Sequence, residues 1–453
     1  MTNDDFEAPR ESGGPAATIE SKPPATRAGL IVPDVRALSF AHSIDARRDE
    51  FVGLAGAIDL DVAFTEVIKV REVRPATFIG QGHVQALKAR VEAEKIELLL
   101  VDAPISPIQQ RNLEKETGAK VLDRTALILE IFGERAATRE GVLQVELAHL
   151  KYQKSRLVRS WTHLERQRGG FGFLGGPGET QIESDRRLLQ DRIKLLEERI
   201  DKVKQTRNQQ KGRRDIKFPV VALVGYTNAG KSSIFNALTG AEVLAKDLLF
   251  ATLDTTVRKI ELPHGREVML SDTVGFVSDL PTDLVAAFRA TLEEVVEADV
   301  ILHVRDIANP DHPAQARDVL KVLGDLGVEP EKVPVIEVWN KIDLLERDDD
   351  GGAPALTTAL PAGRTAAMVR VSAQTGEGLD PLRLAIETAL AAQSRTFRVH
   401  IAHAAGADVG WLYNHAEIIG REDPDEEGQV YEVRIDPRHR TAFTDRFGDR
   451  VAS

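Results

Sequence analysis

The chain has 453 residues, enough for roughly two to four domains with sizeable hydrophobic cores. It contains no cysteine, which excludes disulfides and thiolate metal sites. No apolar run approaches the roughly 18 residues of a membrane span, and no signal-peptide pattern opens the sequence, so we expect a cytoplasmic protein. The net charge of −12 argues on average against nucleic-acid binding, but the charge is unevenly distributed along the chain.

The first part of the chain is predicted to be a disordered tail followed by an α/β domain. Residues 1–35 are rich in Pro, Ala, Gly, Ser and Glu, a composition that favours disorder. Residues 36–135 alternate strand-like and helical runs, which predicts a small α/β domain. The glycine pattern TFIGQGHV at 77–84 is too short for a phosphate-binding loop and indicates a tight turn.

Residues 136–217 are predicted to form an antiparallel helical hairpin. Apolar residues recur at heptad spacing in its second half, at Leu189, Ile193, Leu196, Ile200 and Val203. A plain amphipathic core helix would give the same stripe. Between the two helical segments, residues 168–180 contain six glycines and one proline, so we expect a long loop there.

This hairpin is strongly basic within an acidic protein. From Lys151 to Arg168 there are six Lys/Arg against one acid, and from Arg186 to Lys217 there are twelve against five. A solvated helical face is the ordinary explanation of such charge. Here the excess has one sign and flanks a loop that carries Phe171 and Phe173, with Trp161 nearby. Cations beside aromatic stacking groups favour an RNA-facing surface.

Residues 225–232, GYTNAGKS, fit the phosphate-binding pattern G-x-x-x-x-G-K-[ST]. The strand-like run Val220–Val224 precedes them and the helical run Ser233–Leu238 follows, as the mechanism requires. Backbone N–H groups and the helix N-terminus would hold the phosphates. We expect Lys231 to reach the β- and γ-phosphates and the Ser232 hydroxyl to bind Mg²⁺.

The tetrapeptide NKID at 340–343 predicts that the base is guanine. The Asp343 carboxylate can accept hydrogen bonds from both the ring N–H and the exocyclic amine of guanine, whereas adenine would leave it unpaired. We expect Asn340 to brace the phosphate loop and the stem of Lys341 to cover the ring. Alone the tetrapeptide is weak; behind a strand and downstream of a phosphate loop it is a strong signal.

Two further segments complete a GTP-binding set. Asp272 of DTVG ends a strand-like run and suits a Walker-B carboxylate that holds Mg²⁺ through water. The Gly275 amide would contact the γ-phosphate. Residues 372–374, SAQ, follow another strand-like run and suit a backbone contact to the guanine edge. Four motifs in this order predict GTP binding.

A threonine between the phosphate loop and Asp272 should close over the γ-phosphate and Mg²⁺, an ordering that hydrolysis removes. Thr252, Thr255 and Thr256 all compete for this role, and spacing does not choose among them. Each could instead be a solvated threonine at a strand edge.

The motifs place a GTPase domain at residues 218–394. Residues 395–453 alternate strand and helix in a small α/β domain, with a helix expected near Asp408–Ile418 and no motif of chemical meaning. The expected fold class is α/β: a P-loop GTPase domain with a mixed, mostly parallel sheet and helices on both faces. A small α/β domain and the hairpin precede it, and a small α/β domain follows.

The chain closely resembles the HflX family of ribosome-associated GTPases. Beyond the GTPase loops, the resemblance rests on PATFIGQGHV, VLDRTALILEIF, TREGVLQVELAHLKY, WTHLERQRGGFG and GPGETQIESDRRLL, at 75–84, 121–132, 138–152, 161–172 and 176–189. It covers roughly residues 36–390, while the last 60 or so residues match only in position and size.

The resemblance implies the site residues. The family's switch segment falls on Phe250–Asp254, which singles out Thr252 as the Mg²⁺-closing threonine. Lys231, Thr252, Gly275 and Asn228 are then the expected catalytic residues, and Ser232, Thr252 and Asp272 the magnesium site. The expected GTP-binding residues are Gly225, Tyr226, Thr227, Asn228, Ala229, Gly230, Lys231, Ser232, Phe250, Ala251, Thr252, Leu253, Asp254, Asp272, Thr273, Val274, Gly275, Asn340, Lys341, Ile342, Asp343, Ser372, Ala373 and Gln374.

Phe276 stands where many GTPases place the glutamine that orients the attacking water. An apolar side chain cannot do this, so we expect slow intrinsic hydrolysis that depends on a partner or an ion. Related GTPases with asparagine at the Asn228 position use a potassium ion, and we hypothesise the same here. Thr255, where many relatives have proline, leaves the stiffness of the switch loop open.

The resemblance implies a GTP- and GDP-binding monomer that associates with the large ribosomal subunit and its rRNA, and splits stalled or idle ribosomes. One alternative is an assembly factor that binds precursor subunits. A second is an ATP-dependent RNA-remodelling activity in the N-terminal domain, although that domain shows no phosphate loop. A third, a signalling switch with a protein effector, would have no use for the basic hairpin.

Overall fold

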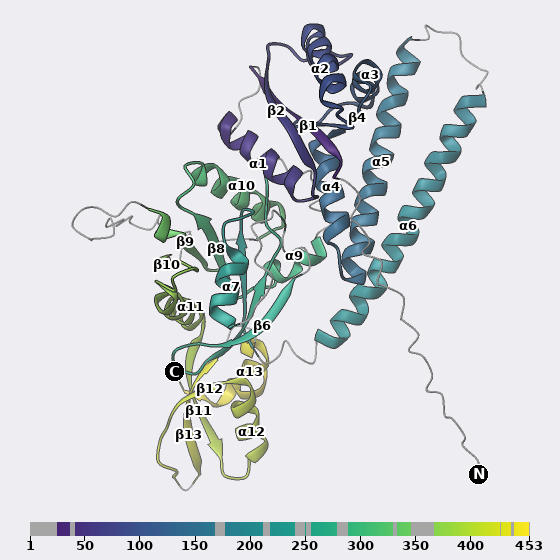
Figure 1. The fold of residues 1–453 in the computed structure, drawn as a ribbon. Helices are drawn as coiled ribbons and strands as arrows, with labels where there is room; N and C mark the ends of the chain where they lie inside the picture. The colour runs from purple at the N-terminus through teal and green to yellow at the C-terminus, as the bar shows by residue number, and fades with distance from the viewer. Residues whose placement is uncertain are drawn as a thin grey trace, which may run out of the picture.

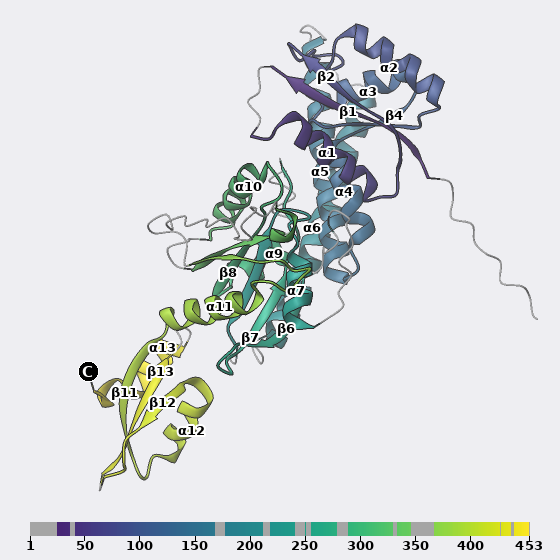
Figure 2. The same cartoon turned by 60° about the vertical axis from the view of Figure 1, so that its left-hand side comes forward.

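The computed structural model describes residues 25–36, 41–167, 177–211, 218–240, 250, 255–278, 289–328, 333–345, 367–425, 427–435 and 439–452. These residues form an N-terminal α/β domain, a helical hairpin, a GTPase-like α/β domain and a small C-terminal domain (Figure 1). In both views the central α/β domain lies between the N-terminal and C-terminal domains (Figures 1 and 2). This is the fold class that the sequence predicts.

The N-terminal domain is a four-stranded, all-parallel sheet in the order β2-β1-β3-β4, covered by helices on both faces. Its elements are β1 (Arg27–Val35), α1 (Ile44–Gly56), β2 (Asp61–Val70), α2 (Gln81–Glu94), β3 (Leu98–Val101), α3 (Pro107–Thr117), β4 (Lys120–Asp123) and α4 (Arg124–Arg135). Successive residues of β1 point into different cores: Leu30 packs with α1 and α4, and Ile31 with α2 and α3. Burial on both faces explains why the central strands β1 and β3 are largely apolar.

The prediction that residues 1–35 form a disordered tail is wrong from Arg27 onward. Residues Arg27–Val35 are strand β1, which pairs with both β2 and β3. The Pro- and Gly-rich composition of the preceding residues obscured this short apolar run. Pro33 is tolerated because β1 has passed the end of β3 at that point, so no N–H is needed on that side.

Helices α5 (Arg139–Gln167) and α6 (Pro177–Lys211) form the predicted hairpin. Their shared seam buries five apolar side chains, Leu147, Leu150, Ile193, Leu196 and Ile200. The glycine-rich residues 168–176, including Phe171 and Phe173, lie outside the described residues. The heptad spacing of the sequence thus specified a real helix–helix contact.

The hairpin is fixed to the N-terminal domain by polar contacts at Asp123. The Tyr152 hydroxyl donates to Asp123 Oδ1 at 2.8 Å, and Arg156 Nη1 donates to Asp123 Oδ2 at 3.1 Å. Arg156 also donates to the backbone oxygen of Ile105 at 3.3 Å. This arginine, one of the cations counted in the basic hairpin, therefore serves to anchor α5.

The GTPase-like domain has a six-stranded sheet in the order β10-β9-β8-β5-β7-β6, in which only β6 runs antiparallel to its neighbour. Its elements are β5 (Val220–Gly225), α7 (Lys231–Thr239), β6 (Thr256–Glu261), β7 (Glu267–Asp272), α9 (Arg289–Val296), β8 (Val300–Asp306), α10 (His312–Asp325), β9 (Val335–Asn340), the 3₁₀ turn η1 (Ile342–Leu344), β10 (Ala367–Arg370) and α11 (Leu379–Gln393). Helices α7 and α11 pack on one face, and α9 and α10 on the other.

The C-terminal domain is a four-stranded antiparallel sheet in the order β12-β13-β11-β14. Its elements are β11 (Arg395–Ala402), α12 (Gly406–His415), β12 (Glu417–Arg421), β13 (Gly428–Ile435), α13 (Arg440–Phe447), η3 (Gly448–Arg450) and β14 (Val451–Ala452). The order of elements is the β-α-β-β-α-β pattern. The helix predicted to reach Ile418 ends at His415, because the following residues alternate exposed and half-buried positions and pair with β13.

One hydrophobic core runs without a break from the N-terminal domain into the GTPase-like domain. It joins Phe51 and Phe132 of the first domain to Phe276 and Val319 of the second. Phe132 and Phe250 meet edge to face, with ring centroids 4.6 Å apart. Because burial of such aromatic rings contributes strongly to stability, the two domains are expected to unfold together.

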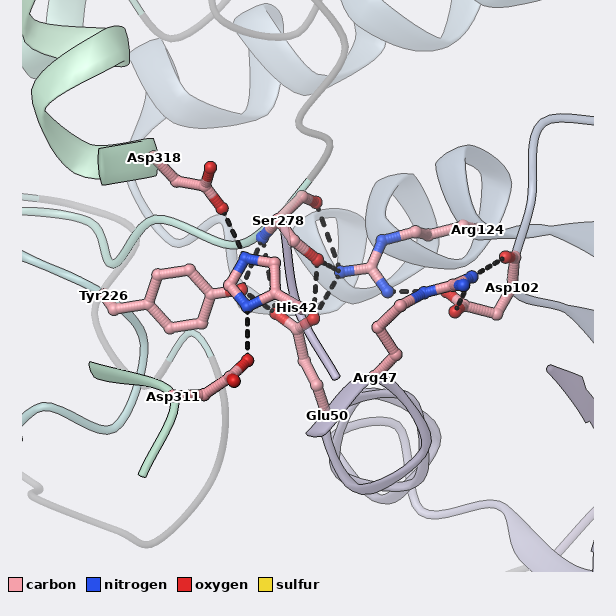
Figure 3. Close-up of polar contacts among 9 residues, drawn as sticks. All are labelled: His42, Arg47, Glu50, Asp102, Arg124, Tyr226, Ser278, Asp311 and Asp318. Carbon is pink, nitrogen blue, oxygen red and sulfur yellow. Dashed lines mark hydrogen bonds and ion pairs between the residues drawn. The ribbon is translucent and has the colours of Figure 1, made fainter. Parts of the chain in front are cut away.

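A buried group of charges lies beside this core, and we call Glu50, Asp102, Arg124, Tyr226 and Ser278 the interdomain polar cluster (Figure 3). Arg124 donates to Asp102 Oδ1 at 2.7 Å, to Glu50 Oε2 at 2.9 Å and to Ser278 Oγ at 2.8 Å. Burial alone would lower the pKa of the Arg124 guanidinium, but the carboxylates of Glu50 and Asp102 raise it.

Replacing Arg124 with methionine should destabilise the protein by about 3–5 kcal/mol, because Glu50 would stay buried without a cation and Asp102 would keep only its ion pair with Arg47. The matched control is Arg48→Met on α1, whose ion pairs with Asp45 and Asp49 are exposed and should be worth about 0–1 kcal/mol. Chemical denaturation measures both changes. Equal losses for the two variants would contradict the role given to the cluster.

Candidate nucleotide site

The phosphate loop joins β5 to α7, as the sequence predicts. Gly225 ends β5, and a Cβ there would lie 2.3 Å from the backbone oxygen of Val304 on β8. Gly230 has φ 91°, and a Cβ there would lie 2.1 Å from Asn340 Nδ2. Both positions therefore exclude any side chain larger than hydrogen, and the loop between them is held close to its neighbours.

Lys231 begins α7 with its side chain inside the loop. It is 6% exposed, and its Nζ donates to the backbone oxygen of Tyr226 at 2.8 Å. Burial lowers the pKa of Lys231 to about 8, and the nearby Asp272 carboxylate opposes this shift only in part. A phosphate brought to this ammonium would restore its preference for the charged form.

Ser232 and Asp272 meet at the carboxyl ends of the central strands. The Ser232 hydroxyl donates to Asp272 Oδ2 at 2.7 Å, and Asp272 is fully buried. A hydroxyl and a carboxylate are hard oxygen ligands of the kind that Mg²⁺ takes, so the donors present fit a magnesium site. When bound, Mg²⁺ would neutralise charge on the β- and γ-phosphates.

The DTVG segment lies directly against the phosphate loop. Thr227 N donates to the oxygen of Phe276 at 2.7 Å, and Phe276 N donates to the oxygen of Gly225 at 3.1 Å. The Thr273 hydroxyl donates to the oxygen of Leu223 at 2.6 Å, while Val274 is buried. These contacts fix the backbone around Gly275 next to Lys231.

The base-binding segments also come together. Asn340 Nδ2 donates to the oxygen of Ala229 at 2.9 Å, and Asn340 Oδ1 accepts from Ala373 N at 3.2 Å. Asn340 thus braces the phosphate loop against the SAQ segment, in which Ser372 is fully buried. A cavity of about 360 Å³ is lined by Asn228, Gly230, Ser233, Asn340, Lys341, Asp343, Leu344, Ala373 and Gln374. The phosphate loop, the NKID segment and the SAQ segment all contribute residues to this lining.

Lys341 occupies a left-handed backbone conformation with φ 65°, and its Nζ lies 2.7 Å from Asp306 Oδ2. Ile342 N donates to the oxygen of Val371, at 3.4 Å. Together these contacts hold the NKID segment against the ends of β8 and β10, and Asp343 lines the cavity.

The predicted switch segment is only partly described. Ala251, Thr252, Leu253 and Asp254 lie outside the described residues, so the assignment of Thr252 stays a prediction. Phe250 has φ 56° and packs its ring against Phe132 of α4, which leaves its backbone as the part that can face a nucleotide.

Tyr226 has a role that its place in the phosphate loop did not predict. Its hydroxyl donates to Glu50 Oε1 at 2.6 Å and accepts from Ser278 N at 2.6 Å, as Figure 3 shows. Burial alone would raise the pKa of Glu50, but Arg124, Tyr226 and Ser278 hold it below its usual value. The phosphate loop is thereby joined to helix α1 of another domain. No sequence signal marked Glu50, which ends the mostly charged run of residues 45–50 in α1.

His42 adds a second tie between the domains. Its Nδ1 lies 2.7 Å from Asp311 Oδ2 and its Nε2 lies 2.7 Å from Asp318 Oδ2, both near or in α10 (Figure 3). Burial alone would lower the pKa of His42, but the two aspartates raise it. The protonated ring suits this position, because both of its nitrogens can then donate.

The fold and the four nucleotide segments define a P-loop GTPase. Four family models match successive parts of the chain: GTP-binding GTPase N-terminal at residues 45–133, GTP-binding GTPase middle region at 135–214, 50S ribosome-binding GTPase at 220–341, and HflX C-terminal domain at 358–452. The last match corrects the expectation that the C-terminal residues resemble the family only in position and size.

Curated relatives named GTPase HflX match over most of the chain. The relative from Magnetococcus marinus is 50% identical over 371 residues, 82% of this chain and 83% of the relative. The one from Escherichia coli strain K12 is 42% identical over 364 residues, 79% of this chain and 82% of the relative. The chain therefore belongs to the HflX family and is a GTPase, which hydrolyses GTP.

Among solved structures, the chain is similar to a GTP-binding protein from the hyperthermophilic archaeon Sulfolobus solfataricus in complex with GDP. That match has 24% identity and a TM-score of 0.42, and covers 80% of this chain and 98% of the other.

The lowered pKa of Lys231 predicts a pH dependence of nucleotide binding. Bound phosphates raise this pKa, so affinity should be constant below about pH 8 and fall by up to about tenfold per unit above it. Fluorescence titration with a non-hydrolysable GTP analogue between about pH 7 and pH 9 measures this. Lys231→Met should bind weakly with a flatter profile. A flat profile for the wild type would contradict the shift.

Proposed function

We propose that this protein binds the large ribosomal subunit in its GTP-bound form, separates stalled or idle ribosomes, and is released when it hydrolyses GTP. The observation that carries the proposal is a basic helical hairpin fixed to a GTPase whose central domain matches the 50S ribosome-binding family model. No helix among the described residues is long and apolar enough to cross a membrane.

The exposed face of α6 supports contact with RNA. Six of its cations are exposed, Arg186, Arg187, Arg192, Lys194, Arg199 and Lys202, and so are five acids, Asp185, Asp191, Glu197, Glu198 and Asp201. Of these, Arg192 pairs with Glu146 of α5 across the hairpin at 2.9 Å. Cations on a rigid helical rod can contact successive phosphates, and such binding weakens steeply with salt. The hairpin runs along the side of the N-terminal domain, where a groove in RNA could receive it (Figure 1).

GTP would drive the cycle by favouring one conformation. An ordered switch segment over the γ-phosphate binds the ribosome better, and hydrolysis removes that preference. The segment after Gly275 is held by Glu50 and Arg124 of the N-terminal domain. Any movement of this segment between GTP and GDP states must therefore be shared with the domain that carries the hairpin.

We also propose that Mg²⁺ binds at Ser232, Asp272 and Thr252, and that potassium binds at Asn228. Asn228 is an exposed residue of the phosphate loop in the left-handed region, with φ 58°, and it lines the base-side cavity. A cation there could stabilise the charge that develops in the transition state. Such charges are worth about 10³–10⁵ in rate in related chemistry.

An assembly role on precursor subunits shares every feature above. The ATP-dependent alternative fits less well, because open parallel sheets bind ligands outside the carboxyl ends of their strands. In the N-terminal domain, Asp102 and Arg124 follow the ends of β3 and β4, and both face the interdomain polar cluster. ATP hydrolysis that survived Lys231→Ala would revive that alternative.

The ribosome proposal is tested by co-sedimentation with large subunits in a GTP analogue or in GDP. We expect binding in the analogue alone, and its loss on deletion of residues 169–178 or in the double variant Lys194→Glu/Arg199→Glu. The matched control is Arg395→Glu/Arg421→Glu, with the same charge change on the C-terminal domain. Equal binding by all proteins would overturn the hairpin model.

Light scattering with intact ribosomes then separates the two ribosomal roles. A drop in scattering on addition of protein and GTP supports splitting. Binding to subunits without any drop would leave assembly as the better function.

The potassium proposal predicts faster GTP turnover in potassium than in sodium, with and without ribosomes. Asn228→Ala should reduce the potassium rate to the sodium rate. Equal wild-type rates in the two salts would refute a potassium site.

A further inference from the structure

Among the residues around Gly275 that the structure describes, none is an obvious group to hold the attacking water. Phe276, which follows Gly275, is 1% exposed and its ring lies in the hydrophobic core shared with the N-terminal domain. Its side chain therefore points away from the phosphates and has no polar atom. Water must be oriented by some other group near Gly275.

Thr227 of the phosphate loop carries a buried hydroxyl that forms no hydrogen bond with the described residues. The residue is 8% exposed, and its Oγ1 makes no hydrogen bond with any residue that the structure describes. Buried hydroxyls are nearly always paired, since an unpaired one is costly. Other buried threonines of the chain follow this rule: Thr117 donates to Leu113 O at 2.7 Å and Thr273 to Leu223 O at 2.6 Å.

The side chain of Thr227 lies against Gly275, with its methyl group as the nearest part. A Cβ built on Gly275 would be 2.9 Å from Thr227 Cγ2 and 3.0 Å from Lys231 Nζ. Thr227 and Lys231 thus converge on the residue whose amide contacts the γ-phosphate in GTPases of this class. No other threonine or serine hydroxyl of the described phosphate loop is available, because Ser232 is engaged with Asp272.

The position of Thr227 is also held firmly. Its N–H donates to Phe276 O at 2.7 Å, and the preceding Tyr226 hydroxyl is clamped between Glu50 and Ser278. Threonine is stiff about its first side-chain torsion because it is branched at Cβ. A hydroxyl on such a support is pre-organised, which is what a water-positioning group needs.

We propose that the Thr227 hydroxyl orients the water that attacks GTP, in place of the missing glutamine. Its oxygen accepts a hydrogen bond from the water while its O–H donates to a γ-phosphate oxygen. The water oxygen bonds to the γ-phosphorus as the bond to the bridging oxygen of GDP breaks. The water proton ends on the inorganic phosphate, and nothing is oxidised or reduced. The competing role is packing alone, in which only the methyl group of Thr227 matters, against Gly275.

Two substitutions separate these roles. Thr227→Val keeps the shape and removes the hydroxyl, whereas Thr227→Ser keeps the hydroxyl and removes the methyl. We expect single-turnover GTP hydrolysis to fall about 100-fold in Thr227→Val and by less than about threefold in Thr227→Ser. The affinity for fluorescent GDP should stay within about threefold of wild type in both, because the hydroxyl acts in the transition state.

A second readout avoids turnover altogether. Binding of GDP with aluminium fluoride, which mimics the transferring phosphoryl group, should weaken in Thr227→Val by about the same factor as the rate. The matched control is Thr239→Val on α7, whose hydroxyl donates to Phe235 O at 2.7 Å away from the phosphates. It should hydrolyse GTP at the wild-type rate.

Two results would overturn the proposal. One is wild-type hydrolysis by Thr227→Val. The other is an equal loss in Thr227→Ser and Thr227→Val, which would assign the residue to packing. A loss of GDP binding in Thr227→Val that matches its loss of rate would show damage to the loop and would likewise count against a transition-state role.

Discussion

The guanidinium of Arg124 is the contact on which the arrangement of the nucleotide site depends. It is enclosed by Asp102 and Glu50 of its own domain and by Ser278 of the GTPase domain. A fully buried cation must be neutralised where it lies, so the three partners cannot move independently. Glu50 in turn accepts the Tyr226 hydroxyl. The ion pairs and hydrogen bonds of Arg124 and Glu50 therefore hold the phosphate loop, the segment after Gly275 and the N-terminal domain together.

This arrangement explains how the GTPase domain can be coupled to a distant surface of the hairpin. The hairpin is rigid along its buried seam and is tied to the N-terminal domain at Asp123. The same domain contacts the phosphate loop at Tyr226 and the segment after Gly275 at Ser278, through Glu50 and Arg124. Coupling between sites is reciprocal, so whatever binds the hairpin and shifts that domain must also alter the nucleotide site. Coupling between the hairpin and the nucleotide site therefore needs no flexible linker.

The sequence predicted which segments meet at the candidate nucleotide site, but it did not predict the contacts between domains. Phosphate and base recognition come from short contiguous segments, each after a strand, so their residues and spacing are visible along the chain. Contacts such as Tyr226 with Glu50 join residues 176 apart, and Ser278 with Glu50 joins residues 228 apart. No local pattern marks such pairs. Strand β1 was missed because the composition of its neighbours outweighed nine apolar-rich residues.

By itself the sequence determined that the protein binds GTP, belongs to the HflX family and carries a basic hairpin. It did so because glycine, lysine and carboxylate positions in a phosphate loop tolerate few alternatives. Only the tertiary structure shows how the side chains of those segments are packed and which residues of other domains contact them. It shows that Phe276 turns into an interdomain core, that Tyr226 is held by another domain, and that the Thr227 hydroxyl is buried without a described partner. Burial and pairing depend on atoms that meet only after folding.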